Sequence, residues 1–358
     1  MNTERTEILI IGGGVAGLST ACHLVKRGQK SLMLLDREAQ PGFYASGHNA
    51  SVGRQLTGCP DHTALTIEGR NRLAAAGDLL NPTGGLLLGA DPGGTDALAA
   101  EAAHFDLRVE RGQGPVLPGL KAAEHLKIPS DGVIDIDGLL RGCAEVARSG
   151  GAQLRFGCQV RAIHPGSAGF EVETDRGVIR TEILVNAAGA WAGELGAMTG
   201  GLTLPFTPLR RHLVWSNAPY PADQPWAWWA DRPLYVRPES GGLLLCACEE
   251  QAVPLPARGQ QPENDEGILE NLFASLRELA PDLAERPIAR LWCGLRTFSP
   301  DRKFVLGRDP VNPRSFWVAG LAGHGMTSGL AVGDLAARLL LEGGSAGPLD
   351  PARFLPSR

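Results

Sequence analysis

The stretch "ILIIGGGVAGLSTACHLVKRG", residues 8–28, decides the fold of this chain. It begins as an apolar strand, passes through a run of glycines, and continues as a helix from about residue 15 to residue 27. Gly28 stands at the position typical of a helix C-terminal cap. A second apolar segment, "SLMLLD" at 31–36, predicts another buried strand. Together these elements indicate a complete β-α-β unit.

The glycines of this unit have the spacing G-x-G-x-x-G, at Gly12, Gly14 and Gly17. Gly12 permits the tight turn, Gly14 lets the backbone approach a diphosphate, and Gly17 lets the helix pack closely on the strand. The free N–H groups at the start of the helix favour the same phosphates. Asp36 ends the second strand, where its carboxylate can accept hydrogen bonds from ribose hydroxyls and would repel a 2′-phosphate. The motif therefore predicts a dinucleotide other than NADP, and does not by itself separate NAD from FAD.

Composition excludes several classes of protein. The chain has 358 residues, of which 43% are hydrophobic and 20% charged, so we expect two globular domains or one with insertions. The net charge of −5 gives no basic excess for nucleic acid or anionic lipid. No apolar stretch approaches 18 residues, and the first one is used by the glycine turn, so neither a membrane span nor a signal peptide is expected.

The cysteines predict a reducing, cytoplasmic environment. Their number, seven, is odd, and no C-x-x-C occurs, so neither a disulfide framework nor a metal site is expected. Cys246 and Cys248 alternate in an apolar run, which predicts two side chains on one face of a strand. The segment "QPWAWWAD" at 224–231 is interpreted as a buried loop or one that faces the active site, with contact to a membrane surface as the alternative.

Nucleotide-type β-α elements recur in the middle and at the end of the chain. A helix is expected at 135–151, a buried strand at 183–190, and a strand, a glycine turn and a long helix at 316–341. Segments rich in strands interrupt them, which predicts an α/β fold, α+β overall, in which a Rossmann-like domain of discontinuous segments carries an inserted antiparallel β-sheet domain. The predicted FAD-binding domain comprises 1–83, 131–203 and 292–358, and the substrate-binding domain comprises 84–130 and 204–291.

Three stretches carry a resemblance to a known family. "PGFYASGHNASVG" at 41–53 is similar to the G-x-S-x-x-N-x-G loop of FAD-dependent oxidoreductases of the D-amino-acid oxidase (DAO) superfamily. "LVNAAGAWAGEL" at 184–195 and "WCGLRTFSPDRKFVLG" at 292–307, followed by "FWVAGLAGHGMTSG" at 316–329, resemble later segments of that family. The likeness covers most of the chain in order. It is closest in appearance to bacterial D-arginine/D-amino-acid dehydrogenases, with glycine and sarcosine oxidases also similar.

The resemblance implies FAD as the cofactor and assigns its contacts. The residues it implies are Gly12, Gly14, Val15, Ala16, Gly17, Asp36, Arg37, Ser46, Asn49, Ala50, Val160, Ala188, Gly189, Trp191, Gly294, Gly323, His324, Gly325, Met326 and Thr327. Apart from the resemblance, the glycine turn at 320–325 opens the last helix, whose free N–H groups suit the negative charge of a reduced flavin. No second strand, G-x-G-x-x-G and helix follow, so a separate NAD(P)H site is not expected.

The resemblance also implies the catalytic residues. Arg296 would clamp the substrate carboxylate, for which a planar bidentate fork is suited, and an ordinary ion pair is the alternative. Tyr235 would point to the same carboxylate, or simply pack in its strand. Arg211 would line the pocket, since strand alternation sends only one of Arg210 and Arg211 inward. His324 would lie beside the flavin or be structural. The implied reaction is hydride transfer from Cα to the flavin, giving an imine that hydrolyses to a 2-oxo acid.

Departures from the family pattern narrow the substrate. The arginine-preferring members carry a histidine where this chain has Val52, and a glutamate where the nearest residue here is Gly85. We therefore expect a small or apolar amino acid, of the D-, glycine or N-methyl type. The cysteine that sarcosine oxidases link to flavin aligns with Gly294 rather than Cys293, so FAD is expected to be bound non-covalently.

Two other functions fit the same sequence features. One is an FAD-dependent dehydrogenase of 2-hydroxy acids, and the other is the flavin subunit of a hetero-oligomeric complex with a partner subunit. The electron acceptor, oxygen or a quinone or dye, is left open. Lys303 lies in the motif neighbourhood where a basic group would influence oxygen reactivity.

Overall fold

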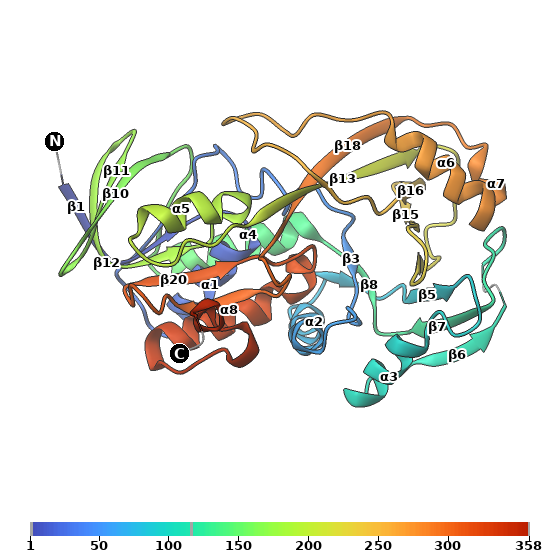
Figure 1. Ribbon diagram of the computed structural model, residues 1–358, viewed down its shortest axis with the longest axis horizontal. Helices are drawn as coiled ribbons and strands as arrows, with labels where there is room; N and C mark the ends of the chain where they lie inside the picture. Colours follow the sequence, from blue (N-terminus) through green and yellow to red (C-terminus); the bar gives the residue numbers. More distant parts are fainter. Residues whose placement is uncertain (1–2, 115–116, 357–358) are drawn as a thin grey trace.

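The computed structural model describes residues 3–114 and 117–356, and its core is two large β-sheets with helices packed on them. Figure 1 shows the first sheet with α1, α4 and α8 at one end of the molecule and the second sheet at the other, with β13 and β18 arching between them. A small sheet, ordered β3-β8-β4, lies near their junction. Its strands are β3 (Val52–Gly53), β4 (Leu80–Asn81) and β8 (Gly132–Ile134).

The first sheet has eight strands, of which β10-β11-β12-β1-β2-β9 form a continuous order. In it, β1 pairs in parallel with β2 and β12, and β12 pairs in parallel with β20. The apolar run of β1 is buried at Leu9 and Ile10, as in a parallel sheet covered on both faces. The strands are β1 (Thr3–Ile11), β2 (Leu32–Leu35), β9 (Gln153–Arg155), β10 (Val160–Gly166), β11 (Gly169–Thr174), β12 (Gly177–Asn186), β19 (Val305–Arg308) and β20 (Ser315–Ala319).

Helices α1 (Val15–Lys26), α4 (Ile136–Ser149), α8 (Gly325–Glu342) and α2 (Pro60–Ala75) belong to this half of the molecule. Helix α8 packs closely against α1 because glycines of α8 face α1. A Cβ atom on Gly333 would lie 2.1 Å from Ser19 Oγ, and one on Gly329 would lie 2.5 Å from the Val15 side chain. Gly69 of α2 approaches the Thr327 carbonyl in the same way. The three helices therefore meet with their backbones close together.

The second sheet has nine strands in the order β17-β13-β16-β15-β14-β5-β7-β6, with β18 paired to β13. It is antiparallel except where β14 and β5 pair in parallel. The strands are β5 (Gly85–Gly89), β6 (Glu110–Gln113), β7 (Glu124–Ile128), β13 (Thr207–Ser216), β14 (Trp226–Trp229), β15 (Tyr235–Glu239), β16 (Gly242–Cys246), β17 (Gln251–Ala252) and β18 (Arg290–Phe298). The remaining α-helices are α3 (Asp96–His104), α5 (Ala192–Met198), α6 (Ile268–Leu279) and α7 (Pro281–Ala284), and the 3-10 turns are η1 (Gly189–Trp191), η2 (Gly347–Leu349) and η3 (Pro351–Phe354).

The predicted α/β class, with a Rossmann-like unit and an antiparallel sheet built from separate segments, is confirmed. The predicted domain boundaries stay a prediction, and β18 belongs to the second sheet through its pairing with β13. Among the helices of the described residues, none combines the length and apolarity that crossing a bilayer requires.

Two local predictions are wrong. Residues 226–229 form a strand rather than a loop, because β5 supplies a partner from a distant part of the chain. The burial expected for this segment is confirmed at Trp226 and Trp229. Cys246 and Cys248 do not share a strand face. Strand β16 ends at Cys246, and Cys248 turns into the left-handed region with φ of 55°, where its N–H lies 3.3 Å from Cys246 Sγ.

The close contact of α8 with α1 predicts the effect of adding one methyl group. Gly333→Ala would drive a Cβ into Ser19, and we expect a loss of about 1–3 kcal/mol in the free energy of unfolding, as for other overpacked cores. Urea unfolding followed by circular dichroism measures it.

Gly142→Ala in α4 is the matched control, since no atom outside its own helix neighbourhood lies within 4 Å of the new Cβ. Alanine is the better helix former, so this variant is expected to gain roughly 0.5–1 kcal/mol. Equal stability of the two variants would contradict the close-contact explanation.

Candidate active site

A cavity of about 520 Å³ lies between the first and second sheets. Its volume falls in the range of small-molecule and cofactor sites. All the residues predicted to contact cofactor or substrate line it, except Gly17. Gly17 instead packs under the turn, where a Cβ atom would lie 1.9 Å from the Gly12 carbonyl oxygen. The structure thus brings the predicted residues together, while their individual roles stay predictions.

The glycine turn at one end of the cavity is fixed by side chains from later segments. Val15 N–H at the start of α1 donates to Ser46 Oγ at 3.0 Å. The Asp36 carboxylate accepts from Gly13 N–H, and also from Glu38 N–H at 2.7 Å. Burial raises the pKa of Asp36. Asp36 therefore holds the turn in shape, a role in addition to the predicted ribose contact, because each carboxylate oxygen can accept a further hydrogen bond.

Arg37 forms the wall beside this turn. Its guanidinium lies 3.8 Å from the centre of the Trp191 ring, and its Nε donates to Glu38 Oε1 at 3.0 Å. Tyr44 donates its hydroxyl proton to the same Glu38 oxygen at 2.7 Å. The stacked arginine and tryptophan give a flat, rigid surface next to Asp36.

The loop at 42–53 meets β18 at Gly294. A Cβ on Gly294 would lie 2.2 Å from the His48 carbonyl oxygen, so no larger residue fits without moving the loop. The neighbouring Cys293 does not line the cavity, and its thiol lies 3.3 Å from the Pro262 carbonyl oxygen. Burial raises the pKa of Cys293 to about 11. The thiol therefore stays protonated and lies on the other side of the strand. Non-covalent binding of the cofactor stays a prediction.

Paired strands bring the two predicted carboxylate-binding arginines to one face. In the β13–β18 pairing, Arg211 lies opposite Gly294 and Arg296 lies opposite Leu209. The two arginines are thus two positions apart along the paired strands and lie on the same face of the sheet. Arg211 Nε and Nη2 donate to the carbonyl oxygens of Glu249 at 2.9 Å and Cys248 at 2.8 Å. Arg210 points to the other face, as alternation predicts, and pairs with Asp265 at 3.1 Å.

Glu250 forms an ion pair with each of these two arginines, which the sequence did not predict. Glu250 Oε1 lies 3.0 Å from Arg296 Nη2 and 3.7 Å from Arg211 Nη2. Arg302 Nη2 donates to both Glu250 oxygens at 2.9 Å. Burial opposes ionisation of Glu250, but the nearby Arg296 and Arg302 outweigh it and lower its pKa. Arg296 therefore does form an ordinary ion pair, which was the alternative to its predicted role. A substrate carboxylate would compete with Glu250 for the same Arg296 donors.

Tyr235 both packs and faces the cavity. It stacks on Trp228 at 4.5 Å between ring centres with an interplanar angle of 29°, and both residues line the cavity. The structural and functional interpretations of this tyrosine are thus compatible.

His324 stands at the N-cap position of α8, among basic side chains. Its pKa lies well below the usual value because it is buried, and because Arg54, His62 and other basic groups lie near it. A neutral imidazole at this position adds no further positive charge to the cavity.

Sequence reasoning missed Arg54 as well as Glu250. Arg54 lines the cavity, donates from Nε to the Leu56 carbonyl at 2.6 Å, and lies 4.5 Å from the centre of the Trp228 ring. The signal was available, since Arg54 directly follows the predicted flavin loop at 41–53. The position of Glu250 had no comparable signal, because the arginines it meets lie far along the chain.

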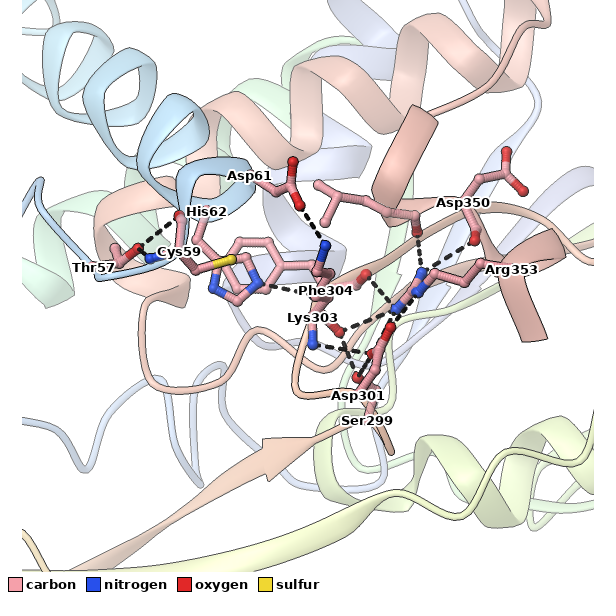
Figure 2. Close-up of polar contacts among 11 residues, drawn as sticks. Thr57, Cys59, Asp61, His62, Ser299, Asp301, Lys303, Phe304, Asp350 and Arg353 are labelled. Carbon is pink, nitrogen blue, oxygen red and sulfur yellow. Dashed lines mark hydrogen bonds and ion pairs between the residues drawn. The ribbon is translucent and has the colours of Figure 1, made fainter. Parts of the chain in front are cut away.

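Lys303 points away from the cavity. Figure 2 shows it reaching Asp61 at the start of α2, at a distance of 2.7 Å, beside a buried His62. The His62 ring stacks on Phe304 at 3.9 Å, and its Nε2 accepts from Phe304 N–H at 3.2 Å. Lys303 is not among the residues that line the cavity, so its ammonium group does not face the cofactor site.

Comparisons with known proteins agree with this layout. The model of the DAO family, described as FAD dependent oxidoreductase, matches residues 7–339. Glycine oxidase from Geobacillus kaustophilus (strain HTA426) is 27% identical over 94% of this chain and 94% of its own length. Mitochondrial dimethylglycine dehydrogenase from Homo sapiens is 28% identical over 99% of this chain, which spans only 44% of that protein. The crystal structure of L-proline dehydrogenase from P. horikoshii has a TM-score of 0.86 at 23% identity, covering 99% of this chain and 98% of that one, which shows the fold alone.

The residues present fit FAD. At one end, Gly14 carries no side chain and stands at the start of α1, where the backbone can approach a diphosphate. At the other end, Gly325, Met326 and Thr327 open α8 and line the cavity. As in the first turn of any helix, their N–H groups lack intrahelical acceptors, and among the described backbone groups none accepts from them. These donors suit the electron-rich edge of a flavin.

The environment of His62 predicts an acid-sensitive stability. Burial lowers its pKa to about 4 from an ordinary 6.5, so between these values the unfolded chain binds more protons than the folded one. The contribution of the neutral His62 to the free energy of unfolding is therefore complete above pH 6.5 and is lost as the pH falls towards 4. Between pH 7 and pH 5 the wild type should lose about 1–2 kcal/mol more stability than His62→Gln.

Urea unfolding at the two pH values measures this difference. His104→Gln, which changes an exposed histidine, is the control and should follow the wild type. The explanation fails if His62→Gln and wild type lose stability in parallel.

Competition by Glu250 predicts that its neutralisation strengthens anion binding. In Glu250→Gln the donors of Arg296 lose a charged partner, so propionate should bind roughly 3- to 30-fold more tightly. Isothermal titration calorimetry measures the dissociation constant. Glu266→Gln removes an exposed charge outside the cavity and should leave it unchanged. Weaker propionate binding in Glu250→Gln would instead mean that Glu250 orients the arginine for its ligand.

Proposed function

This chain belongs to the DAO family of FAD-dependent oxidoreductases, and we propose that it oxidises the Cα–N bond of a small amino acid. It acts as an amino acid oxidoreductase, and the proposed substrate is of the D-, glycine or N-methyl type. The observation that carries the proposal is the pair Arg211 and Arg296, which extend from neighbouring strands into the cavity that α8 also faces.

Each residue at this end has a defined task in the proposed reaction. Arg211 and Arg296 bind the substrate carboxylate, with planar donors that suit two oxygens. Tyr235 is held by Trp228 and adds a hydroxyl to the same region. His324, being neutral, does not repel the substrate amine. Held in this way, the substrate presents Cα at a fixed position, which supplies much of the rate by orientation.

The overall chemistry balances without a nucleophile from the protein. FAD, when bound, supplies an acceptor for two electrons and a proton. Loss of the Cα hydrogen with its electron pair and of one proton from nitrogen leaves an imine. Water then converts the imine to a 2-oxo acid and releases the amine.

The lining of the cavity supports a substrate without a cationic side chain. Val52, Leu213 and Trp228 provide apolar walls. The guanidinium groups of Arg54, Arg211 and Arg296 would repel a positive substituent. Gly85 lies outside the cavity and packs on Trp226, where a Cβ would come within 2.2 Å of the ring, so no acidic side chain is available there to compensate.

We further propose a cytoplasmic location, supported by the free thiols of all seven cysteines, which lie in described residues. The acceptor of the flavin electrons is oxygen or a quinone or dye, and the experiment that identifies the substrate also identifies the acceptor.

A substrate panel tests the proposal. Under anaerobic conditions D-alanine, glycine and sarcosine are expected to bleach the flavin absorbance of the purified protein, and D-arginine is not. Reoxidation by air or by a dye then identifies the acceptor class. Bleaching by lactate or 2-hydroxyglutarate with none by amino acids would replace the proposal with a 2-hydroxy-acid dehydrogenase. A protein that stays yellow with every compound would support a subunit role.

Removal of the carboxylate clamp should affect the reaction and spare the cofactor. Arg296→Lys loses the bidentate fork, so kcat/KM is expected to fall by on the order of 100- to 1000-fold with unchanged flavin content. Arg210→Lys, on the opposite face of the neighbouring strand, is the control and should retain wild-type kcat/KM.

A further inference from the structure

Arg54 lies at the substrate end of the cavity, and it forms no ion pair with any carboxylate of the described residues. Its Nε is used by the Leu56 carbonyl, whereas no described residue accepts a hydrogen bond from its Nη1 or Nη2. Nor does any described carboxylate lie within 4 Å of it. A guanidinium taken out of water without an anion is costly, so its retention calls for a partner supplied from outside.

The acids nearest to Arg54 have other partners. Asp131 attracts Arg54 electrostatically but forms no ion pair with it: its Oδ1 accepts hydrogen bonds from Gln55 N–H at 3.2 Å and Nε2 at 2.8 Å, and its buried Oδ2 has no partner among the described residues. Glu101 accepts from Thr63 at 2.9 Å and from Gly58 N–H at 3.0 Å. Glu250 pairs with Arg296 and Arg302. The terminal nitrogens of Arg54 thus remain available to a ligand in the cavity.

Arg54 and the arginine pair face the same chamber. The Arg54 guanidinium lies 4.5 Å from the Trp228 ring centre, and the Tyr235 ring centre lies 4.5 Å from it in turn. Arg54 is therefore no farther from Tyr235 than twice that distance. Arg54, Arg211, Arg296 and His324 all line the same cavity. A small molecule that reaches the arginine pair beside Tyr235 also comes within reach of Arg54.

We infer that the substrate carries a second carboxylate and that Arg54 binds it, while Arg211 and Arg296 bind the first. This inference rests on the proposed function and replaces its small or apolar side chain with a small acidic one, of the chain length of aspartate or glutamate; D-alanine, glycine and sarcosine would then be the slower substrates. Arg54 is then a specificity-determining residue. Its stacking on Trp228 and its bond to Leu56 hold the guanidinium in place before substrate arrives.

Isosteric substrate pairs test the inference in the holoprotein. D-aspartate is compared with D-asparagine, and D-glutamate with D-glutamine, by anaerobic flavin reduction. The acids are expected to give a kcat/KM on the order of 10- to 100-fold higher than the amides, as for one charge-assisted contact. Equal values for acid and amide would overturn the inference and leave the proposed function standing.

Two variants separate a role in specificity from a role in structure. Arg54→Gln keeps a donor for Leu56 but removes the charge, so the ratio of kcat/KM for acid over amide should fall to about one, mainly through loss of the acid rate. Arg54→Lys keeps the charge and should retain part of the preference. If Arg54→Gln instead lowers flavin content or slows acid and amide alike, Arg54 serves the cofactor or the fold, and the inference is wrong.

Binding of compounds that cannot react supplies a second measurement, independent of turnover. By calorimetry, glutarate should bind the wild type on the order of 10- to 100-fold more tightly than butyrate does. Arg54→Gln should bind glutarate and butyrate equally tightly. If no amino acid reduces the flavin but 2-hydroxyglutarate does, and glutarate still binds through Arg54, the proposed C–N oxidation fails and the dicarboxylate inference holds. Equal binding of glutarate and butyrate by the wild type overturns it.

Discussion

The close contact of α8 with α1 is the constraint on which the rest of the structure depends. Both helices begin at the cavity, and each has first-turn N–H groups that no described backbone group accepts from, although Val15 N–H of α1 donates to Ser46. The two helices pack closely, which the missing side chains of Gly329 and Gly333 allow, and both starts lie at the same cavity. One helix start is then available to the diphosphate of FAD, and the other to its ring system. The position of β18 and its arginine follows from the same contact, since Gly323, just before α8, packs on the Arg296 side chain.

Charge is distributed unevenly along the cavity that results. The end near Asp36 and Arg37 is balanced, because Glu38 neutralises the arginine and Asp36 is bonded to backbone N–H groups. The end near Arg54, Arg211 and Arg296 is lined by an excess of guanidinium groups, with the exposed Glu250 as a counter-ion. In a largely desolvated space such an excess selects anions strongly. The two ends are therefore suited to different tasks, one to holding a cofactor and the other to attracting a carboxylate.

Much of the fold could be predicted because its signals are local. The β-α-β unit at 8–36 and the strand, turn and helix at 316–341 depend on apolar runs and glycines that are close in sequence. The pairing of Arg296 with Glu250 could not be predicted, because it depends on how the connection after β16 lies against β18. The strand at 226–229 was missed for a similar reason, since four residues between turns become a strand only when a distant partner such as β5 is present. For Arg54, the position beside the flavin loop could be predicted from the sequence. Its contacts with Trp228 and Leu56 could not.

The parallel pairing of β5 with β14 has a consequence for synthesis of the chain. Trp226 pairs with Gly85 across a long separation in sequence, and β5 carries the apolar side chains of Leu86, Leu87 and Leu88. During translation β5 leaves the ribosome well before β14, so its open edge and its leucines are exposed while the intervening residues are made. The nascent chain thus passes through a period in which this edge invites association with other chains, and binding by a chaperone at residues 85–89 would protect it.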